Sequence, residues 1–250
     1  MNKYLGIVLI VLPILILLLL NTLKDRFEPH NAIIREQKWS MIPGTILTAL
    51  WIFFSVALWL YNWRKYTTNL FLFEYMDLMF MCICFFLSYQ LIRKKINVSI
   101  VETFNLKTAY LRYILILCGI LTILNIISIH FFDTNFLLRA EPQKYEAIRS
   151  MGMGYTLLFS FVTIIVTPIF EESIFRGLLY APLYRKTGRF FAITLSSLIW
   201  THGHFYYWPN VFGIFLVGIV LAWLYDRSGS LLHPIIFHMF KNSWMLLYMF

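Results

Sequence analysis

The sequence predicts an all-α, polytopic membrane protein with about eight transmembrane helices. Of its 250 residues, 60% are hydrophobic and only 13% are charged, whereas a soluble domain is about 45–50% apolar and about 25% charged. The mean hydropathy is +0.72. Apolar runs near 20 residues, the length that spans a bilayer as a helix, recur along the chain. We expect a single membrane domain over residues 1–250, because few residues remain for a soluble one.

Eight apolar runs are long enough to be transmembrane helices. They cover residues 4–23, 41–62, 69–92, 110–132, 155–184, 188–206, 208–225 and 231–250. The first exceeds a typical signal-peptide core and no small-residue cleavage site follows, so we expect a retained helix. The third carries Glu74 and Asp77 on one helix face. Interfacial placement or bonding between helices is the simplest interpretation of these two carboxylates.

The charge and the cysteines restrict the partners. In a membrane protein, a net charge of +9 reflects basic loops that set topology and meet anionic lipid headgroups. No basic-aromatic pattern favours nucleic acid, so the expected surroundings are the lipid bilayer. Cys82, Cys84 and Cys118 lie in apolar runs without a CxxC pair, which indicates buried, reduced thiols.

The fifth run contains two adjacent carboxylates and an arginine, in IFEESIFRG. Charges at membrane depth are costly and are therefore functional candidates. Glu172 and Arg176 lie four residues apart on one helix face, so we expect an ion pair. Glu171 points about 100° away from Glu172 and lacks a helical partner, which suits a general base. Pro168 predicts a kink that widens a wet, polar cavity around Glu171.

The eighth run carries polar residues in HPIIFHMFKN. His238 and Asn242 are four residues apart and share a helix face. They either hold helices together or present hydrogen-bond donors to a developing oxyanion. Lys241 is expected to point elsewhere, and His233, at the helix start, is expected at the membrane interface.

The sixth run ends in WTHGHF, with His202 and His204. His202 is expected to be an interfacial anchor, and the residues alone leave His204 undecided. A carboxylate with a histidine can activate water, and a histidine with an asparagine can stabilise the oxyanion formed when water attacks a peptide carbonyl. The late helices therefore carry the groups of a hydrolase that cuts peptide bonds without a covalent intermediate.

Other intramembrane protease types fit the sequence less well. No HExxH occurs, so a zinc protease of that kind is not indicated. Ser228 and Ser230, in DRSGSL, have the setting of turn residues rather than of nucleophiles. Tyr225 and Asp226 supply a YD pair, but at a segment end and without a GxGD motif.

Three motifs resemble those of the CPBP intramembrane proteases, the CAAX protease and bacteriocin-processing family, also called Abi. EESIFR matches EExxxR, WTHGH resembles FxxxH, and HMFKN matches HxxxN. They follow one another on successive apolar runs, and the expected catalytic core covers residues 155–245. Trp200 replaces the phenylalanine of the second motif and is expected only to reshape the pocket wall.

The resemblance implies six site residues. Four are catalytic and two support the geometry and charge of the site. They are Glu171 and His204 for water activation, His238 and Asn242 for the oxyanion, and Glu172 and Arg176 for support. The family is often classed among metalloproteases, because glutamate and histidine can ligate zinc. A zinc ion would be held by Glu171, His204 and His238, and we favour the alternative without an obligatory metal.

The resemblance implies an intramembrane endopeptidase of a bacterial cell membrane that acts on a membrane-associated peptide or protein. Bacterial members of the family are associated with bacteriocin self-immunity, peptide maturation or surface-protein processing. One alternative is a non-proteolytic scaffold or immunity protein of the same fold that binds a peptide or a sensor kinase. Another is a transporter with ion sites at Glu74, Asp77 and Glu171, which the lack of a visible repeat disfavours.

Overall fold

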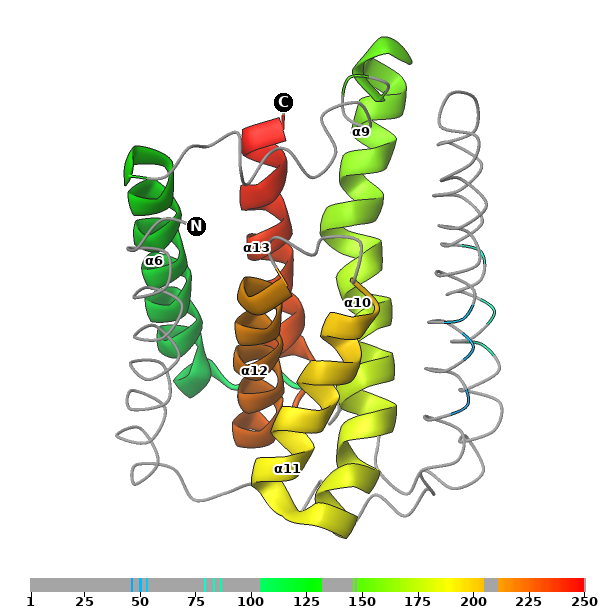
Figure 1. Cartoon of the computed structure of the whole chain (residues 1–250), viewed down its shortest axis with the longest axis vertical. Helices are drawn as coiled ribbons and strands as arrows, with labels where there is room; N and C mark the ends of the chain where they lie inside the picture. Colours follow the sequence, from blue (N-terminus) through cyan, green and yellow to red (C-terminus); the bar gives the residue numbers. More distant parts are fainter. Residues whose placement is uncertain are drawn as a thin grey trace.

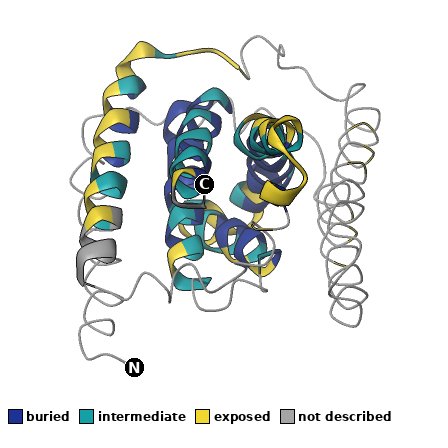
Figure 2. Ribbon diagram, turned by 90° about the horizontal axis from the view of Figure 1, so that it is seen from above, coloured by how far each residue is buried: buried dark blue, intermediate teal, exposed yellow. Residues whose placement is uncertain are grey.

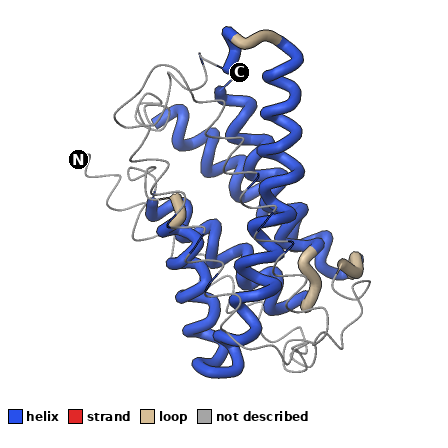
Figure 3. The backbone as a smooth tube through the Cα atoms, turned by 90° about the vertical axis from the view of Figure 1, so that its right-hand side faces the viewer, coloured by secondary structure: helices blue, strands red, loops and turns tan. Residues whose placement is uncertain are grey.

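The structure, a computed structural model, describes residues 104–131, 148–204 and 211–249, with single helical positions at 46, 50, 53, 79, 83, 86 and 146. Every regular element in these ranges is a helix, and they contain no strand (Figure 3). The all-α prediction is confirmed for this part of the chain. The count of eight spans stays a prediction, because the first three runs fall almost entirely outside these ranges.

Some residues singled out from the sequence also fall outside the described ranges. They are Glu74, Asp77, Cys82 and Cys84. Cys118 lies within them and is a free, half-buried thiol.

The longest helical stretch runs from Met153 to His202 and reverses direction once. Its parts, in order, are α9 (Met153–Phe161), η2 (Val162–Val166), α10 (Thr167–Glu172), η3 (Ser173–Tyr180) and α11 (Ala181–His202), of which η2 and η3 are π-helical. Gly188 interrupts α11 with φ 79° and ψ 173°, a conformation that favours glycine. The chain turns back there (Figure 1). This reversal separates the fifth and sixth spans expected from the sequence.

Three further helices pack beside this stretch. They are α6 (Thr108–Phe131), α12 (Val211–Ser228) and α13 (Leu232–Met249). α13 contacts α6, α12, η2 and α10, and α12 lies between α11 and α13. Because α13 packs against α10, its polar residues lie beside the carboxylates of the first motif. The three helices agree within a few residues with the spans expected for them.

The outer faces of the helices are apolar. Leu115, Leu157 and Phe161 are 71%, 62% and 55% exposed, and Figure 2 shows the exposed side of α6 turned away from the other helices. A helix that is apolar on its outer as well as its buried face is expected in lipid. Two described stretches, Met153–His202 and Val211–Ser228, are long and apolar enough to cross a membrane.

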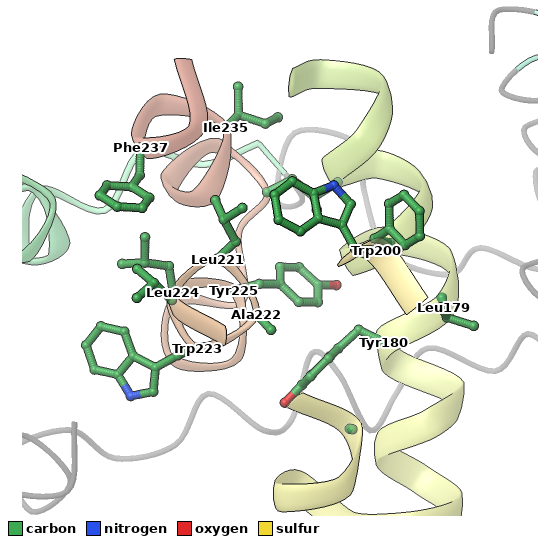
Figure 4. Packing of buried hydrophobic residues seen from close by; sticks show 14 of the residues in the cluster. Leu179, Tyr180, Trp200, Leu221, Ala222, Trp223, Leu224, Tyr225, Ile235 and Phe237 are labelled. Carbon is green, nitrogen blue, oxygen red and sulfur yellow. The ribbon is translucent and has the colours of Figure 1, made fainter. Parts of the chain in front are cut away.

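A close contact between α11 and α12 forms the centre of the core. Trp200, Tyr180 and Tyr225 are fully buried, and Figure 4 shows the first two facing α12. The rings of Tyr180 and Tyr225 meet edge to face with centroids 5.6 Å apart. A Cβ at Gly218 would lie only 3.1 Å from Ser197 Cβ and from Trp200 Cε3. Gly218 is therefore the residue that allows α12 to approach Trp200.

A buried carboxylate ties the reversal to the end of α12. Asp226 accepts a hydrogen bond from the Tyr180 hydroxyl at 2.8 Å and from Arg189 Nε at 2.6 Å. Arg189 directly follows Gly188, the glycine of the reversal. Asp226, the aspartate of the YD pair, is therefore bonded to one residue before the reversal and one after it. Ser228 Oγ accepts from the Ser230 N–H, and Ser230 Oγ accepts from the Leu232 N–H, so both hydroxyls bond within the α12–α13 turn, as predicted for turn residues.

His233 lies at the start of α13, as predicted. Its side chain is fully buried by other parts of the protein, which the sequence did not predict. Its Nε2 donates to Lys107 O at 3.1 Å, and its ring meets Tyr110 edge on at 5.3 Å. The segment before α6 covers this histidine, and no local pattern in the sequence shows that contact.

Candidate active site

The three motifs meet where α10, η3, the end of α11 and α13 come together. The six residues expected there are Glu171, Glu172, Arg176, His204, His238 and Asn242. Five of them are buried, with 0–5% of their surface exposed, and His204 is half-buried. Groups that are far apart in the sequence are thus joined in a single polar cluster inside an apolar bundle.

The predicted ion pair between Glu172 and Arg176 is present. Arg176 NH1 lies 3.2 Å from Glu172 Oε1, and both side chains are fully buried. Arg176 NH2 also donates to Gly218 O at 3.0 Å, and its guanidinium carbon lies 5.4 Å from the centroid of the Trp200 ring. The pair therefore neutralises two buried charges and links the motif to α12.

His238 lies between the two carboxylates of the first motif. Its Nδ1 is 2.9 Å from Glu172 Oε1, and its Nε2 is 3.9 Å from Glu171 Oε2. Glu172 Oε1 also accepts from Arg176, so the proton of this hydrogen bond is assigned to Nδ1. Nε2 then faces Glu171 with a lone pair when the ring is neutral and with an N–H when it is charged.

The Glu171 carboxylate is held by an indole. Trp200 Nε1 donates to Glu171 Oε2 at 2.6 Å, whereas the 3.9 Å to His238 Nε2 is too long for a hydrogen bond. Within the described residues, Glu171 Oε1 has no hydrogen-bond partner. Trp200 was expected only to reshape the pocket wall, and the only sequence signal for this contact is that tryptophan, unlike phenylalanine, has an N–H.

His204 is oriented by the backbone of the same tryptophan. Its Nδ1 donates to Trp200 O at 2.9 Å, and the two rings lie 4.6 Å apart. Since a carbonyl only accepts, Nδ1 carries the proton, and Nε2 is an acceptor in the neutral ring. His202 is exposed at the end of α11, as expected of an interfacial anchor.

Asn242 bonds to the π-helical segment beside Pro168. N–H groups there bond five residues back, so Pro168, which has no N–H, cannot serve Thr163 O in this way. Asn242 Nδ2 donates to that oxygen at 2.9 Å. An amide nitrogen has two N–H groups, so one remains for another acceptor.

Lys241 lies closer to the site than the sequence suggested. Its Nζ donates to Asn242 Oδ1 at 3.3 Å, and its charge interacts with Glu171, His204 and His238. The expectation that Lys241 points elsewhere was wrong, because a flexible four-carbon side chain can bend towards a neighbouring face of its helix.

The zinc ligands considered from the sequence are not grouped as a metal site in the described residues. Among the described residues, no three His, Cys, Asp or Glu side chains are grouped so that they could hold a metal ion. The Nδ1 atoms of His204 and His238 bond to Trp200 O and Glu172, so their Nε2 atoms are the ones that could face a metal ion. The described geometry does not group these Nε2 atoms with Glu171 as a three-ligand set.

A family model and two curated proteins match part of this chain. Residues 153–244 match the family described as type II CAAX prenyl endopeptidase Rce1-like. A Bacillus subtilis protein named "Putative membrane peptidase YdiL" is 32% identical over 110 residues, 43% of each chain. A Staphylococcus aureus protein named membrane-embedded CAAX protease MroQ is 30% identical over 99 residues, 36% of this chain and 39% of its own length.

These matches are partial in length. The chain spans about two fifths of the curated relatives that it matches. No solved structure matches it. The family resemblance expected from the three motifs is nevertheless confirmed, because residues 153–244, which hold all six site residues, match the Rce1-like type II CAAX prenyl endopeptidases.

Proposed function

We propose that this chain is a multi-pass membrane endopeptidase that hydrolyses a peptide bond in a membrane-associated peptide or protein. The observation that carries the proposal is the burial and the hydrogen bonding of the Glu171 carboxylate. Its carboxylate is 4% exposed, one oxygen is held by Trp200 Nε1, and the other has no hydrogen-bond partner among the described residues. A buried carboxylate with one open oxygen is suited to take a proton from water.

In this mechanism Glu171 Oε1 and His204 activate the attacking water. Nδ1 of His204 is already used by a backbone carbonyl, so Nε2 is the atom that can accept a hydrogen bond from water. The oxygen of the water attacks the peptide carbonyl carbon while its proton passes to Glu171. The tetrahedral intermediate then collapses, the C–N bond breaks, and Glu171 returns the proton to the leaving amine.

The oxyanion of the intermediate needs hydrogen-bond donors. The second N–H of Asn242 is one, since only one N–H is used by Thr163 O. His238 is the other, and it donates from Nε2 only in its charged form, because Nδ1 is committed to Glu172. Glu172, oriented by Arg176, thus fixes the direction in which the imidazole donates.

A second observation favours a wet interior at this site. Glu172 Oε2 is buried and has no hydrogen-bond partner in the described part of the chain. A buried carboxylate oxygen without a protein partner is a place where an ordered water is expected. Water beside Glu172 is consistent with a site that hydrolyses its substrate.

The organisms and the names of the two relatives suggest a cellular role. Both come from bacteria and are named for membrane peptidase or protease activity, which supports our proposal that this protein acts in a bacterial cell membrane. Bacteriocin self-immunity, peptide maturation and surface-protein processing each involve a substrate at the membrane. Any of these roles would be served by the same peptide-bond hydrolysis.

The test compares cells that express the wild type with cells that express Glu171→Gln at matched membrane levels. New peptide termini in membrane and medium are mapped by mass spectrometry, and bacteriocin sensitivity is scored in parallel. We expect a set of termini that is lost in Glu171→Gln but kept in Asp226→Asn, a matched change of a buried carboxylate away from the site. Identical termini in all three strains, with an unchanged phenotype, would favour the scaffold alternative.

A further inference from the structure

We propose that Trp200 is a positioning residue for the reaction, which holds Glu171 Oε2 so that Oε1 is the oxygen presented to water. The inference rests on the proposed function. It starts from the 2.6 Å hydrogen bond between Trp200 Nε1 and Glu171 Oε2. Both partners are buried, and a hydrogen bond to a charged acceptor is stronger than one between neutral groups.

The indole is locked in the orientation that this bond requires. Trp200 is fully buried and packs edge to face against His238, with centroids 5.6 Å apart and planes at 87°. The Arg176 guanidinium lies over its ring, and a Cβ at Gly218 would come within 3.1 Å of Cε3. Because the ring contacts groups from α12, α13 and η3, its N–H direction is set by packing.

Trp200 also orients the second group that is proposed to activate water. Its backbone oxygen accepts from His204 Nδ1, and the two rings are in contact. A single residue thus positions Glu171 through its side chain and His204 through its carbonyl. Phenylalanine would keep the carbonyl and most ring contacts but would lose the N–H, so Trp200→Phe isolates the effect on Glu171.

No other described group replaces the lost donor. His238 Nε2 is 3.9 Å from Glu171 Oε2, and Lys241 and Arg176 interact with Glu171 through charge alone. Without the indole N–H, the Glu171 carboxylate can rotate about its Cγ–Cδ bond. Either oxygen can then turn towards His238, Lys241 or Arg176. The fraction of molecules with an oxygen directed at the water then falls.

The first arm of the test is spectroscopic and needs no substrate. Protein labelled with ¹⁵N-tryptophan in lipid nanodiscs gives indole N–H signals, one for each of the eight tryptophans. We expect Glu171→Gln to move the signal that is missing from Trp200→Phe. The signal of Trp223, whose buried Nε1 has no hydrogen-bond partner among the described residues, should stay in place. If no indole signal responds to Glu171→Gln, the hydrogen bond is absent and the inference falls.

The second arm measures turnover on a peptide that spans a Glu171-dependent terminus. Trp200→Phe should lower kcat roughly tenfold or more with little change in KM, the scale of a lost hydrogen bond to a charged group. Trp223→Phe, the same change at another buried indole, should leave kcat unchanged. A merely structural role would lower folded yield and leave kcat per folded molecule as it was, which would overturn the inference.

The two proposals fail in different ways. If Glu171→Gln removes the termini but Trp200→Phe turns over like wild type, the inference is wrong and the proposed function stands. If the termini persist in Glu171→Gln, the proposed function is wrong and the inference fails with it.

Discussion

Replacement of Arg176 by methionine is expected to destabilise the folded protein by about 3–5 kcal/mol, the range for breaking a buried ion pair. The side chain is fully buried and lies 3.2 Å from Glu172 Oε1 and 3.0 Å from Gly218 O. Methionine has a similar length but no charge, so it leaves a carboxylate without its cation and a carbonyl without its donor. The carbonyl alone accounts for about 1–3 kcal/mol of this loss.

The double variant Glu172→Gln/Arg176→Met separates charge from packing. It removes both charges, and replacing a whole buried pair is often close to neutral, so it should recover at least half of the lost stability. It should remain inactive, because Glu172 also orients His238. Lys186→Met, at an exposed position in α11, is the matched control and should unfold like the wild type.

The assay is denaturant unfolding of purified protein in detergent micelles, followed by tryptophan fluorescence. Free energies of unfolding are compared among the wild type, Arg176→Met, the double variant and the exposed control variant. A loss below about 1 kcal/mol in Arg176→Met, the scale of an exposed ion pair, would refute the assignment of a buried pair. So would a double variant that is no more stable than Arg176→Met.

Three other changes test separate parts of the structure. Asn242→Ala should lower turnover roughly 10²–10³-fold, the scale of one oxyanion donor, as measured on a Glu171-dependent peptide; a loss below about threefold would remove Asn242 from the oxyanion site. Asp226→Asn should cost about 1–3 kcal/mol of unfolding free energy without changing kcat per folded molecule, and a changed kcat would place Asp226 in the chemistry. Gly218→Val should cost about 1–3 kcal/mol by overpacking and shift the Trp200 indole signal, and wild-type stability would contradict the close approach of α11 and α12.

Helix positions could be predicted because lipid imposes them. A backbone in hydrocarbon must satisfy its hydrogen bonds internally, so a long apolar run has few alternatives to a helix. The described helices agree with five of the expected runs for this reason, and Gly188 marks the reversal that separates two of them. The Glu172–Arg176 pair followed from i,i+4 spacing alone, since both partners lie on one helix.

Contacts between helices could not be predicted in the same way. The burial of His233 depends on the segment before α6, and the bond from Asn242 to Thr163 O depends on π-helical register next to Pro168. Lys241 approaches Glu171 because its long side chain bends, which helical spacing does not show. The hydrogen bond of Trp200 is of the same kind, since its acceptor is 29 residues away in the chain.

The central claim is that Glu171 is the base that activates water, and the most direct measurement is the ratio of kcat for Glu171→Gln and wild type. Both proteins are purified into nanodiscs at equal folded fraction and assayed on the peptide identified in cells. If Glu171 is the base, kcat falls by about 10²–10⁴-fold, the contribution of a general base, with little change in binding. A kcat within about threefold of wild type would contradict it.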